Sequence, residues 1–311
     1  MTVIPPDLEE RFHQPENWQW NYFERVKGRR LRYGFAIPDD AETIVFYLPG
    51  LAEPAEKAFE TGRNMLERGC GFAVMDWFGQ GGSGRYLPNP HKRHAGPFED
   101  DLADFHECLT RLAPKLKGKK LVMLAHSMGG NLGLRYLHDH PSTFESAAFT
   151  APMIGIYAVK SIPPFITNYL AAGLSAIAGN FYVMGGGDWK FPALLPAMDK
   201  AFLSSDPVRA ALQNQLFKAN PEIVVSDVTY GWIYHAYNSC AALSAQLSGI
   251  QTHVLLAAAG KDFLVDSAAI KTASSVMSHA TFLEFPDSRH EILMERDEIR
   301  DRFLSAFYDL I

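Results

Sequence analysis

The sequence has few cysteines, no excess of basic charge and no repeated or low-complexity segment. Its three cysteines, Cys70, Cys108 and Cys240, are an odd number at wide spacings, so we expect free thiols in a reducing compartment rather than a disulfide framework. A net charge of −6, from 29 Lys and Arg against 35 Asp and Glu, provides no sequence-wide positive field for phosphates. We therefore expect no nucleic-acid partner.

A signal peptide is not visible at the beginning of the sequence. The first twenty residues carry Asp7, Glu9, Glu10 and Glu16, and no apolar segment of the kind found in a signal peptide. We predict a cytoplasmic protein, peripheral to the inner membrane if it meets a membrane at all. The composition, 47% hydrophobic and 21% charged, excludes disorder and coiled coil and predicts a globular protein with a sizeable core.

Short apolar runs alternate along the chain with longer stretches of helical pattern. The runs cover residues 43–48, 71–76, 121–125, 147–150, 253–259 and 281–285. Most are apolar on both faces, as strands covered by helices on two sides must be. Residues 18–25 and 31–36 form a hairpin-like opening that would add antiparallel edge strands. We therefore predict an α/β protein with a doubly wound, mostly parallel sheet.

The alternation stops after residue 152 and resumes near residue 253. This predicts a core in two parts, residues 1–155 and 229–311, with a helical cap inserted at residues 156–228. Residues 161–187 carry no charged side chain, and 165–184 are nearly long enough for a membrane span. Polar residues and glycines interrupt this stretch and it has no basic flank, so we favour a cap helix, with an interfacial lipid-touching surface as the alternative. Residues 232–247 predict a helix that returns to the sheet.

The most informative motif is LVMLAHSMGG at residues 121–130, in which an apolar strand runs into a serine between small residues. A nucleophile on a strand-to-helix turn needs an unhindered backbone on both sides, which Ala125 and Gly129 provide. The turn places Ser127 at a helix N-terminus, where free N–H groups favour developing negative charge. Ser127 is the candidate nucleophile, although an N-cap serine would give the same local pattern.

The partners of such a nucleophile are expected after other strands, at the edge where open α/β sheets bind ligands. The strand at 43–48 ends in Pro-Gly-Leu, so the backbone N–H groups of Leu51 and Met128 are candidate oxyanion donors. Asp262 follows the strand at 253–259, and His290 follows the strand at 281–285. In this arrangement Asp262 orients His290, which takes the serine proton. Weaker candidates for the acid are Asp266 and Asp287.

Residues 47–51 (YLPGL), 76–84 (DWFGQGGSG), 125–130 (AHSMGG), 260–262 (GKD) and 288–291 (SRHE) together resemble the α/β-hydrolase superfamily. Within it the chain resembles the bacterial lysophospholipase and monoacylglycerol lipase branch. The resemblance implies an α/β-hydrolase fold with these roles: Ser127 as nucleophile, Asp262 as acid, His290 as base, and Leu51 and Met128 as oxyanion donors. Three residues depart from the family pattern: Ala125 in place of Gly, Pro49 in place of His, and Pro54.

By this resemblance we expect a serine hydrolase that cleaves esters of lysophospholipids or monoacylglycerols and uses no cofactor or metal. Aromatic residues of the cap would line an acyl-chain pocket: Phe165, Tyr169, Phe181 and Tyr182. The alternatives are a small-ester carboxylesterase, an aminopeptidase, or a non-catalytic lipid-binding protein of the same fold. An aminopeptidase would need acidic residues in the cap to hold the substrate ammonium, and residues 161–187 contain none. Transient contact between the cap and a membrane surface is also expected.

Two further motifs are weak. Residues 79–84 match G-x-G-x-x-G, but Pro88 and Pro90 follow too closely for the helix that a dinucleotide site requires, so we interpret the segment as a flexible turn. Residues 91–94, HKRH, have no accompanying ligand cluster and predict a solvated basic loop rather than a metal site.

Overall fold

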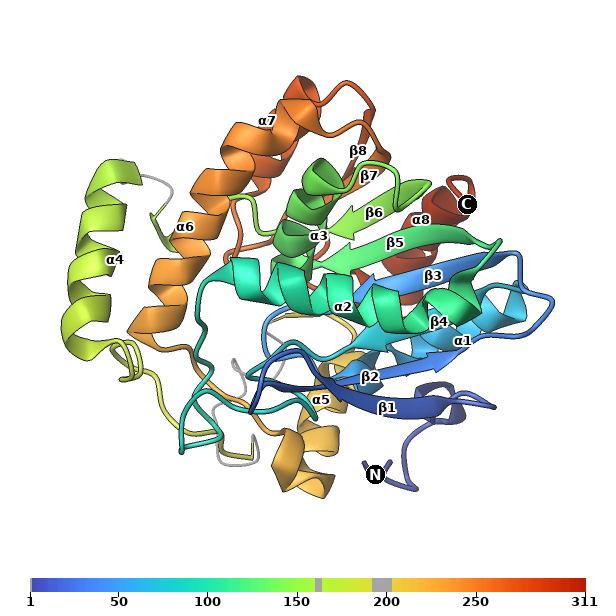
Figure 1. The fold of residues 1–311 in the computed structure, drawn as a ribbon, viewed down its shortest axis with the longest axis horizontal. Coiled ribbons are helices and arrows are strands. Elements are labelled where there is room, and N and C mark those ends of the chain that lie inside the picture. Colours follow the sequence, from blue (N-terminus) through green and yellow to red (C-terminus); the bar gives the residue numbers. More distant parts are fainter. Residues whose placement is uncertain (1, 160–163, 192–202) are drawn as a thin grey trace.

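The computed structural model describes residues 2–159, 164–191 and 203–311. The strands of this part of the chain are β1 (Gln19–Glu24), β2 (Arg30–Ala36), β3 (Thr43–Leu48), β4 (Gly71–Met75), β5 (Lys120–His126), β6 (Ser146–Thr150), β7 (His253–Ala259) and β8 (Ala280–Phe285). They form one eight-stranded sheet in the order β1-β2-β4-β3-β5-β6-β7-β8 (Figure 1). β2 is antiparallel to both β1 and β4, and the other pairs are parallel. The predicted α/β-hydrolase fold with a mostly parallel sheet is confirmed.

Helices cover both faces of this sheet. The α-helices of the described residues are α1 (Phe59–Glu67), α2 (Phe98–Leu116), α3 (Ser127–Asp139), α4 (Pro164–Ala178), α5 (Pro207–Ala219), α6 (Tyr230–Gln246), α7 (Ser267–Val276) and α8 (Asp297–Tyr308). Val45 and Phe46 are neighbours in β3 and both fully buried, yet they pack into different clusters, because successive side chains of a strand point to opposite faces. α2, α3, α6 and α7 contribute to the cluster of Phe46, and α1 and α8 to that of Val45.

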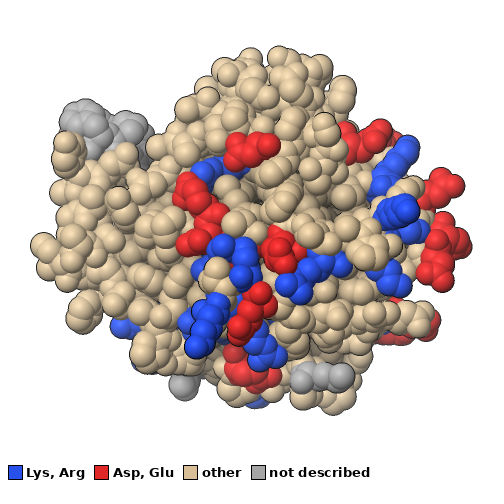
Figure 2. All heavy atoms as spheres, in the orientation of Figure 1, with Lys and Arg blue, Asp and Glu red and all other residues tan. Residues whose placement is uncertain are grey.

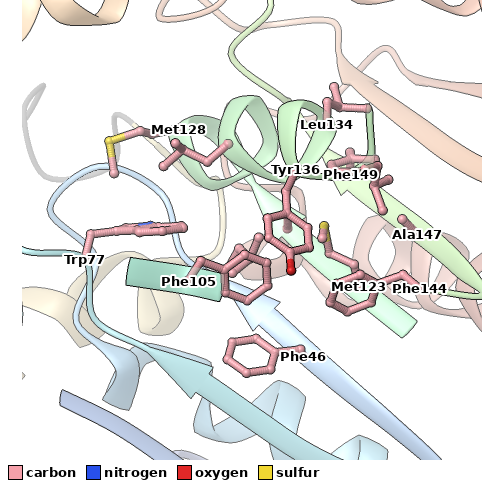
Figure 3. Packing of buried hydrophobic residues seen from close by; sticks show 14 of the residues in the cluster. Phe46, Trp77, Phe105, Met123, Met128, Leu134, Tyr136, Phe144, Ala147 and Phe149 are labelled. Atoms are coloured by element: carbon pink, nitrogen blue, oxygen red, sulfur yellow. The ribbon is translucent and has the colours of Figure 1, made fainter. Parts of the chain in front are cut away.

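Phe105 of α2 lies within the larger of these clusters (Figure 3). Its ring centroid is 5.1 Å from that of Phe46 and 4.7 Å from that of Tyr136 in α3, both in edge-on geometry. Complete burial of one such side chain contributes about 1.5–3 kcal/mol. The cluster therefore holds α2 and α3 against the sheet and fixes the point at which α3 begins.

Between β6 and β7, the described residues form the α-helices α4, α5 and α6. α6 corresponds to the predicted helix at 232–247, and it packs between α3 and the outlying α4 (Figure 1). α5 packs through Leu212 and Leu216 against Phe12 of the N-terminal segment. The predicted cap boundaries, 156 and 228, stay a prediction. α4 ends at Ala178, and within the described ranges no helix is long and apolar enough to cross a membrane.

Two loops differ from their sequence-based descriptions. The basic loop at 91–94 is not solvated throughout, because Arg93 is fully buried. The glycine-rich segment at 79–84 is an ordered inward-facing loop rather than a flexible turn: Gln80 is fully buried, and a Cβ atom on Gly81 would lie 2.0 Å from Asp76 Oδ1. The glycines allow the chain to close around this carboxylate. Cys70, Cys108 and Cys240 are free and buried, as expected.

Candidate active site

The candidate nucleophile lies at the junction of β5 and α3. β5 ends at His126 and α3 begins at Ser127, whose φ of 51° is in the left-handed region that residues other than glycine rarely adopt. The Ser127 carbonyl accepts a hydrogen bond of 2.9 Å from the N–H of Met153. A Cβ atom on Gly129 would lie 2.3 Å from the carbonyl oxygen of Leu48, so glycine is required for α3 to start this close to β3. The strained turn holds Ser127 at the carboxyl edge of the sheet.

Two loops at the ends of neighbouring strands bring the candidate base and acid to Ser127. Asp262 follows β7 and His290 follows β8. His290 Nε2 is 2.9 Å from Ser127 Oγ, and His290 Nδ1 is 2.7 Å from Asp262 Oδ2. A chain of hydrogen bonds therefore runs from hydroxyl through imidazole to carboxylate, with His290 Nδ1–H donating to Asp262. Such a chain allows the imidazole to take the hydroxyl proton.

The carboxylate of Asp262 is held on its second oxygen as well. Asp262 Oδ1 accepts hydrogen bonds from the N–H groups of Leu264, at 2.8 Å, and Val265, at 3.1 Å. Burial alone would raise the pKa of Asp262, but the hydrogen bond and charge interaction with His290 and the two backbone donors hold it below its usual value. The carboxylate is thus ionised and fixed in orientation at neutral pH.

The two weaker acid candidates have other partners. Asp266 is the N-cap of α7 and accepts a hydrogen bond from the N–H of Ala268. Asp287 is exposed and forms an ion pair of 2.8 Å with Lys261. Of the three carboxylates considered, the structure brings only Asp262 to His290.

The candidate oxyanion donors lie on either side of Ser127. Leu51 belongs to the loop after β3, residues 49–53, which we call the oxyanion loop, and Met128 is the second residue of α3. A Cβ atom on Gly50 would lie 3.2 Å from the Cβ of Ser127, so this loop lies directly against the nucleophile. In the described part of the chain, no protein oxygen accepts a hydrogen bond from the N–H of Leu51 or of Met128. Both amides are free to donate to a substrate oxygen.

A buried cation joins the oxyanion loop to the loop that carries His290. Lys57 Nζ is 2.8 Å from Glu53 and 2.5 Å from Glu291, the residue after His290. Glu53 also accepts a hydrogen bond of 2.6 Å from the N–H of Gly50. Burial opposes ionisation of both groups, but the Lys57 charge lowers the pKa of Glu53 to about 2, and the two carboxylates raise the pKa of Lys57. Burial raises the pKa of Glu291 against the attraction of Lys57, so Lys57 and Glu53 are the pair that these shifts keep ionised at neutral pH.

His126 completes this polar region without carrying charge. Its ring lies 4.7 Å from that of His290, and its Nδ1–H donates to the carbonyl oxygen of Thr150 at 3.0 Å. Burial lowers the pKa of His126 to about 4, against the attraction of Glu53. Glu53, His126 and Glu291 offer atoms within 4.8 Å of one another, as a metal site would. The ammonium of Lys57 already binds both carboxylates, so the donor set fits a cation only if Lys57 is displaced.

Ser127 and His290 open into a cavity of about 330 Å³. Its apolar wall is formed by Met153, Ile156, Val228, Trp232, Ile233 and Leu264. Its polar end is formed by Glu53, His126, Gln213 and Glu291. A mostly apolar pocket with a few polar groups at the reacting atoms is typical of small-molecule sites.

Of the four cap residues predicted to contact substrate, Tyr169, Phe181 and Tyr182 are not among the described residues that line this cavity. Tyr169 is 81% exposed, because the buried side of α4, which packs against α6, carries other residues such as Ala171. Phe181 lies beyond the end of α4 and is 65% exposed. Tyr182 donates a hydrogen bond to Asp188 near the surface. The side chain of Phe165 lies outside the described residues. Tyr169 lies in α4, and the phase of that helix, which its uncharged sequence does not reveal, decides that this side chain faces outward. The role of these cap residues in substrate binding stays a prediction.

Sequence reasoning missed the polar residues around the reacting groups. Gln213 is distant in sequence from the motifs, and Lys57 follows the 47–51 motif without belonging to it. Glu291 was noted as part of a motif without a role. The one available signal was the spacing of Glu53 and Lys57, which form an i,i+4 ion pair. That spacing is common on solvated helices, so it could not by itself indicate a buried network.

The fold and this geometry define an α/β-hydrolase with a Ser–His–Asp arrangement at the carboxyl edge of its sheet. Comparison with known proteins gives the family: residues 39–297 match the family model described as serine aminopeptidase, S33, and the chain belongs to that family. The predicted resemblance to the lysophospholipase and monoacylglycerol lipase branch is confirmed.

Curated relatives cover most of the chain. Lysophospholipase L2 of Escherichia coli K12 is 30% identical over 280 residues, which are 86% of this chain and 80% of the relative. Probable lysophospholipase L2 of Haemophilus influenzae is 24% identical over 293 residues, which are 94% and 91% of the two chains. Among solved structures, a soluble variant of the monoglyceride lipase of Saccharomyces cerevisiae is 16% identical with a TM-score of 0.72, covering 96% of each chain. This last similarity shows the fold.

Proposed function

We propose that this protein is a serine hydrolase that cleaves the carboxylic ester of a single-chain lipid, a lysophospholipid or monoacylglycerol. The observation that carries the proposal is the hydrogen-bonded chain of Ser127, His290 and Asp262 at one end of a cavity with an apolar wall. The relatives named lysophospholipase and the fold neighbours named monoacylglycerol or monoglyceride lipase support the same substrate class.

The reaction proceeds through an acyl-enzyme. Ser127 Oγ attacks the ester carbonyl carbon while His290 takes the hydroxyl proton, and Asp262 stabilises the imidazolium. The carbonyl oxygen becomes an oxyanion that accepts hydrogen bonds from the N–H groups of Leu51 and Met128. His290 then protonates the leaving alcohol. Water, deprotonated by His290, attacks the acyl-enzyme and releases the fatty acid, returning the proton to Ser127.

The charge of the cavity favours an ester over a peptide with a free N-terminus. An aminopeptidase must hold the substrate ammonium with an unpaired carboxylate. Among the described residues of the cavity, the carboxylates are Glu53 and Glu291, and both bind Lys57. The acyl chain instead finds apolar cover along Met153 and Trp232.

Contact with a membrane surface is part of this proposal. α4 carries no charged residue and exposes Tyr169, Leu170, Leu174 and Ile177 to solvent. Figure 2 shows few charged residues at the edge of the molecule where α4 lies in Figure 1. An apolar, uncharged helix face can rest at a lipid interface, where single-chain lipid substrates reside.

The test compares wild type with Ser127→Ala on a panel of monoacylglycerols, lysophospholipids, short p-nitrophenyl esters and aminoacyl p-nitroanilides, with products read by mass spectrometry. We expect lipid esters to be preferred and Ser127→Ala to lose about four to six orders of magnitude in kcat while keeping its fold. A fluorophosphonate probe should label Ser127 in wild type only. Equal turnover by both proteins would refute the proposed nucleophile, and no turnover or labelling would indicate a binding protein of the same fold.

A further inference from the structure

The glycine-rich loop after β4, which takes no part in the proposed reaction, contacts the oxyanion loop. Gln80, in the glycine-rich loop after β4, is fully buried beneath it. Gln80 Nε2 donates to the carbonyl oxygens of Gly50, at 2.8 Å, and Glu53, at 3.0 Å. Gln80 Oε1 accepts from the N–H of Ala52 at 3.1 Å. One side chain thus holds the backbone on both sides of Leu51.

The orientation of this amide is fixed by Arg93. Arg93 Nε donates to Gln80 Oε1 at 2.9 Å, which fills the second acceptor position of the amide oxygen. Arg93 is itself fully buried, and no described carboxylate lies within ion-pair distance of it. Its Nη2 lies 3.7 Å from Met128 Sδ, in the residue with the other oxyanion donor. The guanidinium therefore contacts Met128 directly and reaches the oxyanion loop through Gln80.

The surrounding loop is built to admit these side chains. A Cβ atom on Gly79 would lie 2.7 Å from Arg93 Nη1, so a larger residue there would displace the guanidinium. Trp77 Nε1 donates to the carbonyl oxygen of Pro49 at 2.8 Å, and the backbone N–H of Ala55 donates to Asp76 Oδ1 at 2.9 Å. The loop after β4 is thus bonded to the oxyanion loop and to the residues just beyond it.

We propose that Gln80, oriented by Arg93, is a positioning residue that directs the N–H of Leu51 at the substrate oxyanion. Ala52 has a φ of 61°, a conformation that costs a non-glycine residue about 1–2 kcal/mol. The hydrogen bonds of Gln80 to the adjacent backbone stabilise this conformation while the N–H of Leu51 stays free. The inference rests on the proposed function, because it requires an oxyanion to form at Leu51.

The test replaces Gln80 by Met, which keeps the length of the side chain and removes its hydrogen bonds. We expect kcat for a lipid ester to fall by about 10- to 100-fold with KM changed by less than about threefold, since a displaced donor weakens binding of the transition state only. The Ki of a long-chain alkyl trifluoromethyl ketone, which forms an oxyanion on the serine, should rise by a similar factor. Gln251→Met, the same change at an exposed residue, should alter neither quantity.

If Gln80→Met does not fold, Arg93→Lys decides the question, because it keeps the charge but replaces the planar guanidinium, whose Nε–H donates to Gln80 Oε1, by a single ammonium at the end of the chain. We expect about a 3- to 10-fold loss in kcat without a matching rise in KM. A folded Gln80→Met, or failing that Arg93→Lys, with wild-type kcat and trifluoromethyl ketone affinity would overturn the inference, even if its melting temperature fell. Failure of the proposed function would differ, because wild type itself would then show no Ser127-dependent turnover.

Discussion

The ammonium of Lys57 binds the carboxylate of Glu291, the residue that follows His290, at 2.5 Å. The same ammonium binds Glu53, whose other oxygen accepts from the N–H of Gly50. The loop that carries the candidate base and the loop that carries a candidate oxyanion donor are therefore tied together by one buried charge. Neither loop can shift without disturbing the other.

Lys57→Met should destabilise the protein by about 3–5 kcal/mol, because it leaves two buried carboxylates without their cation. Glu291→Gln should cost less, since Lys57 keeps Glu53 as its partner. Urea unfolding of the two variants measures the difference. Lys271→Met, at an exposed residue of α7, is the control. A Lys57→Met protein as stable as this control would contradict the ionic network.

Asp262→Asn should lower kcat by about 10³- to 10⁴-fold, because the amide cannot stabilise the imidazolium of His290 or hold its reactive tautomer. The fold should persist, since Asn can still accept from the N–H groups of Leu264 and Val265. Asp287→Asn should leave kcat unchanged, because Asp287 is exposed and paired with Lys261. Steady-state kinetics of both variants on one lipid ester measures the two values of kcat. Comparable losses in both variants would remove the assignment of Asp262 as the acid.

Gly129→Ala should reduce both stability and turnover, because the new Cβ atom would meet the backbone oxygens of Leu48 and Pro49 at 2.3 and 2.5 Å. Relief of this clash must move the oxyanion loop or the start of α3, and we expect about a 10- to 100-fold loss in kcat. Gly173→Ala in α4 has nothing within 4 Å of the new atom and should be neutral or slightly stabilising. Thermal unfolding and kcat of both variants provide the measurement.

The contribution of His126 to stability should fall as the pH is lowered from 7 to 5, whereas Asp101, whose pKa burial raises to about 7, contributes with the opposite sign in wild type and variant alike. The imidazole of His126 titrates near pH 6.5 in an unfolded chain, whereas burial lowers its pKa to about 4 in the folded protein. Between these values the unfolded chain binds a proton that the folded protein does not. The contribution of His126 to the free energy of unfolding is therefore complete above pH 6.5 and is lost as the pH falls toward 4. Between pH 7 and pH 5 this loss is about 2 kcal/mol.

His126→Asn measures this contribution, because the amide N–H can replace Nδ1–H as the donor to Thr150 without titrating. Chemical unfolding at pH 7 and pH 5 should show a smaller loss in the variant than in wild type. His94, whose pKa burial also lowers to about 4, adds a dependence of the same sign to both proteins. An identical loss in both would show that His126 does not carry the effect.

The uncharged face of α4 should mediate binding to lipid. Ile177→Asp places a charge on a side chain that is 87% exposed, so the fold should tolerate it, while burial in a lipid interface becomes unfavourable. We expect co-sedimentation with phosphatidylcholine vesicles to fall at least about fivefold. Ser275→Asp, on the exposed side of α7, adds the same charge as a control. Equal sedimentation of the two variants would contradict docking through α4.

The sheet could be predicted from the sequence because its determinants are local. β3 and β7 were expected at residues 43–48 and 253–259, and both strands have those bounds. Each is a continuous apolar run, and such a run by itself predicts a strand that is buried on both faces. Ser127, Asp262 and His290 were located because each follows such a run, and in a parallel sheet the ends of the strands meet at one edge.

The contacts of the cap could not be predicted in the same way. The sequence of α4 is uncharged on all sides, so nothing in it shows that Tyr169 points outward. That direction depends on how α4 packs against α6, which is a tertiary contact. The loops after β3 and β4 have no periodic sequence pattern, so their bends and their close contacts could not be predicted either.

The chain alone determined the order of strands and helices and the residues placed at their ends, because hydrophobic periodicity and turn chemistry act over a few neighbouring positions. Only the tertiary structure decided that Lys57, Gln80 and Arg93 surround the oxyanion loop. Nothing in the sequence distinguishes these three from other polar residues. All three are buried, and a buried polar side chain is stable only when it forms hydrogen bonds or ion pairs, here with groups from other segments of the chain.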